Sequence, residues 1–148
     1  PAATLADVRD MRRRVAEARA RERADPWSLK HAEGGMMDVE FALQAGLLVT
    51  GLTGARAPRE AAARLSRSGW LDPARAATLA EAHALALALQ QIERVALDRP
   101  FDPETAGPGL RAAMARAGDA PDFEALTARL IAVQRAAAEA AQAVLDQG

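Results

Sequence analysis

Apolar residues recur at steps of three and four along most of the chain, the spacing of one face of an α-helix. Prolines, glycines and aspartate–proline pairs interrupt this pattern, and such residues begin or end helices. The spacing predicts helices over residues 4–24, 36–50, 58–68, 72–97, 109–117 and 122–144, with a loop over 100–108. We therefore predict an all-α fold, a bundle of five to six helices that forms one domain over residues 1–148.

Residues 84–89 read ALALAL, an alternation that is also typical of a β-strand. No glycine or proline interrupts the surrounding segment, and a strand of that length would be abnormal. As a helix, the segment places Leu85 and Leu89 on one face and Leu79 and Leu87 on another. A helix that is apolar on two faces is predicted to lie at the centre of the bundle.

The composition narrows the function classes. Alanine is abundant and aromatic residues are scarce, which favours close packing of helix on helix. With 19 basic and 20 acidic residues the chain has no global field that would attract nucleic acid. Because cysteine is absent, thiolate metal sites and disulfides are excluded, and no apolar run is long enough to span a membrane. We expect a cytoplasmic protein and no membrane partner, and the start at Pro1 suggests a piece of a longer chain.

Asp38 and Glu40 resemble a pair of carboxylates that would hold Mg²⁺, but the helical phase excludes this, because side chains two residues apart on a helix stand about 200° apart. We therefore predict no metal site here. Glu40 and Gln44 are predicted within an apolar stripe made by Met37, Phe41, Leu47 and Leu48. They either fix the helix by bonding to each other, to an arginine or to loop amides, or they face a cleft that another domain and a ligand complete.

Gly34 and Gly35 stand directly before the helix that starts at residue 36. Glycine allows close approach of the backbone, and the amides at a helix start are a suitable place for an anion. Lys30 is the only lysine among the 19 basic residues, and a compact ammonium group near these amides would assist anion binding.

Residues 29–44, LKHAEGGMMDVEFALQ, resemble the signature of the helical domain in the glutamine synthetase adenylyltransferase family. Residues 7–15, DVRDMRRRV, are similar to the helix that leads into that signature from a nucleotidyltransferase domain. The downstream SGWLD turn and the ERVALDRP helix end agree with the same pattern. A related helical domain occurs in PII uridylyltransferases, but the match through Glu40, Phe41 and Gln44 favours the adenylyltransferase.

The resemblance implies a parent enzyme with two nucleotidyltransferase units, each followed by a helical bundle. Such enzymes attach AMP from ATP to a tyrosine of glutamine synthetase and remove it by phosphorolysis, under the control of glutamine and the PII signalling protein. Their Mg²⁺ and ATP are bound by a G-S motif and paired aspartates on a strand, and this chain contains neither. We therefore expect no catalytic residue, no cofactor bound by the fragment alone and no transferase activity of the isolated chain.

The resemblance also gives the candidate residues a place. Aspartate at position 38, where the first bundle of such enzymes more often has glutamate, favours the C-terminal bundle. Lys30, the Gly34 and Gly35 amides and Asp38 are expected to line the cleft toward the preceding nucleotidyltransferase domain, near the nucleotide phosphates. Glu40 and Gln44 are expected to anchor the helix or to contact the regulator site. The alternatives are a module that binds PII or glutamine synthetase without a part in chemistry, and the equivalent domain of a PII uridylyltransferase.

Overall fold

The computed structural model describes residues 2–147. Within them the chain forms helices only, which confirms the all-α prediction. There are seven helices in the described part, slightly more than the predicted five to six: α1 (Ala2–Ala18), α2 (Ala20–Arg23), α3 (Met36–Thr50), α4 (Pro58–Arg67), α5 (Pro73–Ala96), α6 (Pro108–Ala117) and α7 (Phe123–Leu145).

The additional helix arises because the predicted helix over residues 4–24 is broken at Arg19. The backbone of Arg19 leaves the helical region, with φ −123° and ψ 33°, and its amide bonds to the carbonyls of Val15 and Ala16. The apolar spacing that defines α1 has ended by this point, so no apolar face holds the two segments in line. The break turns α2 back toward α3, where Arg23 finds an ionic partner.

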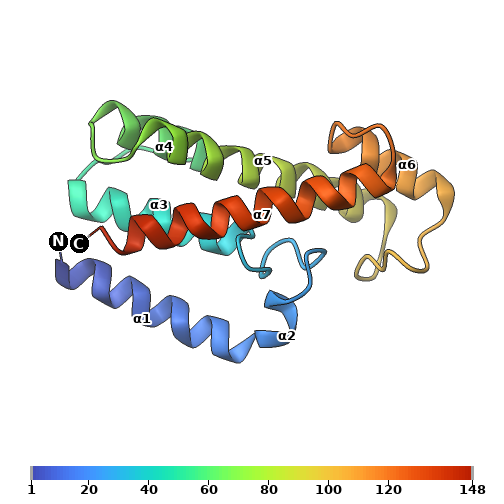
Figure 1. Ribbon diagram of the computed structural model, residues 1–148, viewed down its shortest axis with the longest axis horizontal. Coiled ribbons are helices and arrows are strands. Elements are labelled where there is room, and N and C mark those ends of the chain that lie inside the picture. Colours follow the sequence, from blue (N-terminus) through green and yellow to red (C-terminus); the bar gives the residue numbers. More distant parts are fainter. Residues whose placement is uncertain (1, 148) are drawn as a thin grey trace.

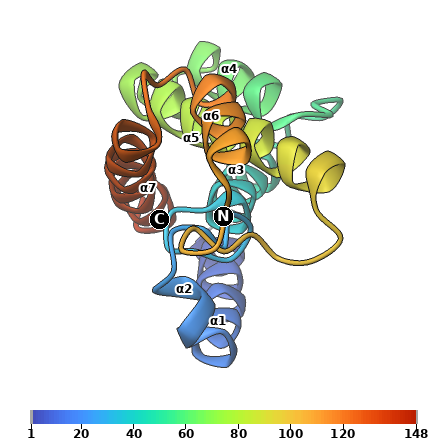
Figure 2. The same cartoon turned by 90° about the vertical axis from the view of Figure 1, so that its right-hand side faces the viewer.

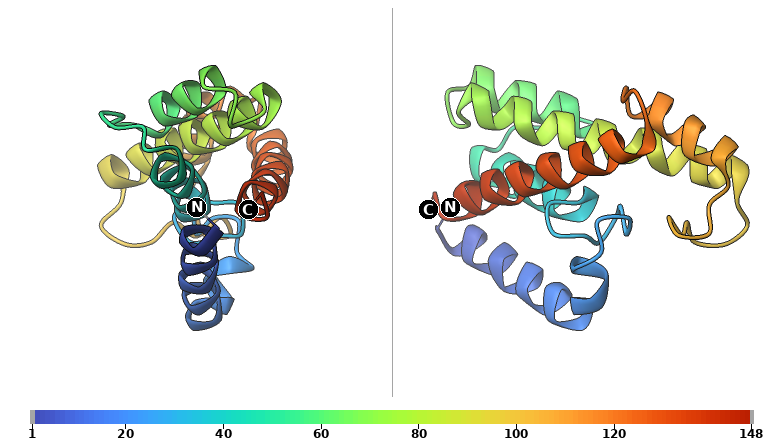
Figure 3. Two further views of the ribbon diagram at one scale, coloured as in Figure 1. Left: turned by 90° about the vertical axis from the view of Figure 1, so that its left-hand side faces the viewer. Right: turned by 45° about the vertical axis from the view of Figure 1, so that its right-hand side comes forward.

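The long helices α5 and α7 run across the molecule, with α3 and α4 beside them and α6 at the far end (Figure 1). Helix α1 lies along one edge against α3 and α7, and α2 turns back from the end of α1 toward the loop before α3 (Figure 2). The two further views show the same projecting position of α1 (Figure 3). The start of α1 and the end of α7 meet in a small apolar cluster that contains Leu5, Ala45 and Leu145.

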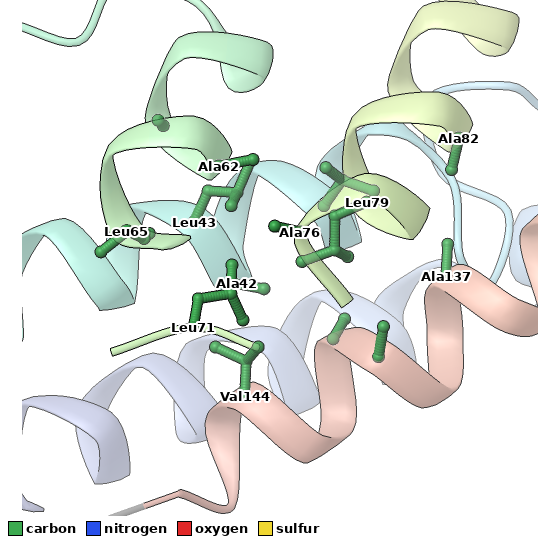
Figure 4. Close-up of a cluster of buried hydrophobic side chains, with 14 residues drawn as sticks. Ala42, Leu43, Ala62, Leu65, Leu71, Ala76, Leu79, Ala82, Ala137 and Val144 are labelled. Carbon is green, nitrogen blue, oxygen red and sulfur yellow. The ribbon is translucent and has the colours of Figure 1, made fainter. Parts of the chain in front are cut away.

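Helix α5 is central, as its two apolar faces predict, and it packs on α3, α4, α6 and α7. Its first half, with Leu79, belongs to a core formed together with α3, α4 and α7 (Figure 4). Its second half, with Leu85 and Leu89, belongs to another cluster around α6 and the start of α7. Many positions in the first core are alanine, such as Ala42 and Ala137, so the helix axes can approach closely.

Candidate functional site

Asp38, in the first turn of α3, is the centre of a buried polar cluster. Its residue exposure is only 1%. Arg23 donates two hydrogen bonds to its carboxylate, at 3.0 and 2.8 Å. Arg12 of α1 donates two longer ones, both at 3.4 Å, and the Gly34 amide donates a fifth at 2.8 Å. The cluster thereby joins α1, α2 and the loop before α3 to α3 itself.

The ionisation of Asp38 follows from these contacts. Burial by itself raises the pKa of the Asp38 carboxyl group, because it disfavours the charged form. The hydrogen bonds from Arg23, the Gly34 amide and Arg12 act in the opposite direction and outweigh burial, so the net pKa lies below its usual value. The same ion pair raises the pKa of Arg23. Asp38 is therefore a carboxylate, with both oxygens occupied by donors from this chain.

The two glycines allow a close packing of the loop against α7. Gly34 has φ +76°, and a Cβ placed there would lie 1.8 Å from the backbone carbonyl oxygen of Gln134. A Cβ on Gly35 would lie 2.6 Å from the Leu29 carbonyl oxygen. Neither position has room for a side chain, so glycine is required by the fold at both.

The expectation that the Gly34 and Gly35 amides are free for an anion is wrong. The Gly34 amide donates to Asp38, and the Gly35 amide donates to the Ala32 carbonyl at 2.8 Å. The next amide, of Met36, donates to the Leu29 carbonyl. The anion at this helix start is thus supplied by the chain itself, as a carboxylate in the first turn.

Lys30 lies in the loop between α2 and α3, and it is exposed. Its carbonyl accepts a hydrogen bond from the Met37 amide at 3.0 Å, which fixes the backbone of Lys30 to the start of α3. Its neighbours Leu29 and Trp27 are buried. The ammonium group therefore sits on an anchored loop and remains accessible.

Glu40 and Gln44 lie on the other side of α3, beside Met37, Phe41 and Leu47 of the predicted stripe, but this stripe is not deeply buried. Both are exposed. The Glu40 carboxylate accepts a hydrogen bond from Nε2 of His83 at 3.2 Å. Glu40 and Gln44 line a groove of about 400 Å³ with the half-buried Met37 and Phe41. Three members of the predicted stripe, Met37, Phe41 and Leu47, line this groove. The buried side of α3 carries the small residues Ala42 and Ala45 together with Val39 and Leu43.

The separation of Asp38 and Glu40 agrees with the helical phase, since one side chain is buried and the other faces solvent. Among residues 2–147, no three or more histidine, aspartate or glutamate side chains gather closely enough to hold a metal ion. The Asp38 cluster is thus an ionic junction between helices, and the Glu40 side of α3 is an accessible surface.

Several residues of the site were missed from the sequence. Arg12 and Arg23 are two of many arginines, and no local pattern distinguishes them. Gln134 of α7 is buried, and it donates a hydrogen bond at 2.8 Å to the Pro26 carbonyl, which holds the loop. A polar residue within the apolar seam of the last helix was a signal that could have identified Gln134.

An aromatic cluster fixes the other end of the same loop. Trp27 stacks on Phe123 at the start of α7, with ring centroids 5.3 Å apart and ring planes 9° from parallel. Phe101, from the segment between α5 and α6, packs against Trp27 at 4.9 Å. The loop that carries Lys30 is therefore held from both sides, by aromatic packing and by the Asp38 cluster.

The fold and this segment define a class of helical domain. Residues 9–99 match the family described as GlnD PII-uridylyltransferase, and the chain belongs to that family. The match includes most of α1, the whole signature segment and helices α3 to α5.

Within this class the chain is similar to glutamine synthetase adenylyltransferases. It is 42% identical over 134 residues to the bifunctional glutamine synthetase adenylyltransferase/adenylyl-removing enzyme of Bradyrhizobium sp. strain BTAi1, an alignment that covers 88% of this chain and 13% of the relative. The same enzyme of Xanthobacter autotrophicus is 38% identical over 138 residues, 90% of this chain and 14% of the relative. That of Bradyrhizobium diazoefficiens is 39% identical over 153 residues, 99% of this chain and 15% of the relative.

The resemblance predicted from residues 29–44 is confirmed by these relatives. The chain spans about 13–15% of the length of the curated relatives it matches. No solved structure gives a significant match. In the described residues, no helix combines the length and apolar character that crossing a membrane requires.

Proposed function

We propose that the chain is a helical accessory domain of an enzyme that attaches AMP to glutamine synthetase and removes it, in the regulation of nitrogen metabolism. The observation that carries this proposal is the 42% identity, over 88% of the chain, to an enzyme named for both activities. The parent acts in the cytoplasm, with glutamine synthetase as its substrate, the PII signalling protein as a partner and glutamine as an effector. The chain is its C-terminal bundle.

The domain supports the nucleotide cleft of a preceding nucleotidyltransferase domain, and it contributes no catalytic residue. The parent uses Mg²⁺ and ATP, but the residues of this chain do not fit a Mg²⁺ ion. Asp38 is the one fully buried carboxylate of the signature, and guanidinium and amide donors occupy both of its oxygens. Glu40, the nearest acidic residue along α3, faces the opposite side. The metal and the nucleotide are bound by the preceding domain, and the fragment alone binds neither as a cofactor.

Within the signature, Lys30 is the residue that reaches the nucleotide phosphates across the interdomain cleft. Its exposure and its anchored backbone support this role. Gly34, Gly35 and Asp38 act through the loop, because their contacts set its position against α3 and α7. Glu40 and Gln44 face away from this loop, and their role is to contact the regulator of the parent enzyme.

The test of the nucleotide role uses the full-length enzyme and steady-state AMP transfer to glutamine synthetase. Lys30→Ala should raise the KM for ATP about tenfold, the effect of losing one contact to a charged group. Lys30→Arg should restore part of it, because the charge is kept. Arg14→Ala removes an exposed basic residue of α1 and serves as the matched control. An unchanged KM for ATP in Lys30→Ala, with the fold intact by circular dichroism, would refute the role.

A second test concerns the domain as a whole. The purified 148-residue chain, which lacks a nucleotidyltransferase domain, should transfer no AMP to glutamine synthetase. AMP incorporation into glutamine synthetase by this chain alone would overturn the assignment as an accessory domain.

The second candidate function is a protein-binding module for PII or glutamine synthetase with no part in chemistry. The groove beside Glu40 and Gln44 favours it, because half-buried apolar side chains such as Phe41 are accessible there. A pull-down of the chain against both proteins, with and without glutamine, tests this candidate. Under it, Phe41→Ala weakens capture while Lys30→Ala leaves the KM for ATP unchanged.

The family description favours one further alternative, the equivalent domain of a PII uridylyltransferase. The substrate of the full-length parent distinguishes the two enzymes. UMP transfer to PII, without AMP transfer to glutamine synthetase, would assign the chain to the uridylyltransferase.

A further inference from the structure

Four arginines line one concave surface between α1, α2 and α7. The pocket has a volume of about 340 Å³, within the lower part of the range of ligand sites. Its lining consists of Arg9, Arg12, Arg13, Ala16, Arg23 and Gln142, and none of these is acidic. The proposed roles of the signature residues do not use this pocket.

Two of these arginines are held in fixed positions. Arg12 and Arg23 both bind the carboxylate of Asp38, and Arg12 also donates to the Gln142 side chain at 2.6 Å. Their side chains are only 13% and 16% exposed. The two guanidinium groups share one directly bonded carboxylate, and Glu33 acts on Arg23 only through its charge, so part of their positive charge is not neutralised by a direct ion pair.

The other two arginines stand one turn apart on the exposed face of α1. Arg13 lies 3.6 Å from Asp10 and 3.4 Å from Glu17, both of which are solvent-exposed, so these pairs hold it weakly. Among the described residues, Arg9 has no carboxylate within ion-pair distance. Both side chains are therefore available to a ligand that enters from solvent.

The charge on the neighbouring surface shows which side of the Arg12–Arg23 pair an anion would occupy. A larger groove of about 960 Å³ opens on the α7 side of the same two arginines. Besides Arg12 and Arg23 it is lined by one further arginine, Arg135, and by three acidic residues, Glu33, Glu139 and Asp146, so that its acidic and basic groups balance. The smaller pocket on the α1 side has the same two guanidinium groups without these carboxylates.

We propose that Arg9, Arg12, Arg13 and Arg23 form a binding site for a small anion that carries phosphate groups. The planar guanidinium group matches two phosphate oxygens at once, and a ligand with several phosphate oxygens can engage the fixed pair and the two exposed arginines together. The site lies on a different set of residues from the signature loop. It stands independently of the proposed function of the domain.

The experiment is isothermal titration calorimetry of the 148-residue chain with inorganic pyrophosphate at low ionic strength. Arg9→Ala should weaken binding about tenfold, the loss expected from one charge-assisted contact. Arg14→Ala is the matched control, because Arg14 is an exposed arginine of the same helix that does not line the pocket. Both substitutions are at exposed positions, so circular dichroism should show an unchanged fold.

A second titrant and a second variant separate this site from others. Citrate carries several carboxylates but no phosphate, and it should bind more weakly than pyrophosphate. Lys30→Ala should leave pyrophosphate binding unchanged, which keeps this proposal distinct from the nucleotide role of Lys30. Absence of pyrophosphate binding, equal losses in Arg9→Ala and Arg14→Ala, or equal affinity for citrate would each overturn the proposal.

Discussion

Replacing Asp38 by asparagine removes the one negative charge that Arg12 and Arg23 share. Breaking a buried ion pair by removing one partner costs about 3–5 kcal/mol, because the remaining charge is left without compensation. Here the loss is smaller, since the two guanidinium groups are 13% and 16% exposed and recover part of their hydration. Asparagine also keeps an oxygen for the Gly34 amide. We expect Asp38→Asn to lower the free energy of unfolding by about 2–3 kcal/mol.

Urea unfolding near neutral pH, followed by far-UV circular dichroism, measures this loss. With a slope of about 2 kcal/mol per molar urea, the midpoint should fall by about 1–1.5 M. Asp10→Asn is the control, because Asp10 is 62% exposed and, among the described residues, forms an ion pair with the equally exposed Arg13. Its effect should stay within about 0.5 kcal/mol. If Asp38→Asn lies within the same limits, the ionic junction does not stabilise the fold.

The pH dependence of the same variant gives an independent test. The pKa of Asp38 is lower in the folded chain than in the unfolded one, because the donors outweigh burial. The stabilisation is therefore present above the unfolded pKa of about 3.9, and it is lost as the pH falls through the folded pKa. The difference in stability between wild type and Asp38→Asn should shrink in acid. A difference that stays constant down to the acid transition would contradict the assigned ionisation.

Two further substitutions test the packing of the loop and an isolated carboxyl group. Gly34→Ala should lower the free energy of unfolding by more than about 3 kcal/mol, measured by urea unfolding, because its Cβ would overlap a backbone carbonyl of α7. Gly51→Ala is the control: Gly51 has φ +70° and open space around it, so the loss should be about 1 kcal/mol. Burial raises the pKa of Glu93 to about 7, so its penalty is absent below the unfolded pKa of about 4.3 and complete above about pH 7. Glu93→Gln should therefore raise stability at about pH 8 relative to about pH 4 by roughly 1 kcal/mol, discounted for partial exposure; equal effects at both pH values would contradict this.

Most helix boundaries were predictable because local signals determine them. The Asp72–Pro73 pair begins α5, and the Asp72 side chain accepts a hydrogen bond from the Arg75 amide at 3.1 Å. Asp122 caps α7 in the same way, with a bond of 2.7 Å from the Ala125 amide. Caps and first-turn prolines act within one turn of helix, so the sequence contains the whole interaction.

The break at Arg19 was not predictable from local signals, since its cause lies elsewhere in the fold. Arg23 must leave the line of α1 to reach Asp38, which is 15 residues further along the chain. Residues 19–24 carry no apolar spacing that would oppose the break. A contact between distant residues therefore decides a local conformation, and the spacing of apolar residues cannot predict such a contact.

The sequence did not predict which candidate residues are buried, for a different reason. Helical phase gives the angle between Asp38 and Glu40 correctly, but it does not say which of the two faces the core. Large apolar side chains around Glu40 suggested that its face was the buried one, whereas α3 packs most deeply through small residues such as Ala42 and Ala45. In an alanine-rich bundle the closest helix contacts are made by the smallest side chains, so hydrophobicity alone points to the wrong face.

The position of Asp38 connects the two proposed sites. Its carboxylate holds the Gly34 amide, which belongs to the loop of Lys30, and it holds Arg12 and Arg23, which form the floor of the arginine pocket. A phosphate-bearing anion in that pocket would contact guanidinium groups that Asp38 also holds, and any weakening of the Asp38 contacts would change the anchoring of the loop. By linkage, a ligand at the Lys30 loop must then alter the affinity of the pocket by the same factor. The buried carboxylate, which cannot serve as a metal ligand here, is suited to transmit this effect between α1 and α3.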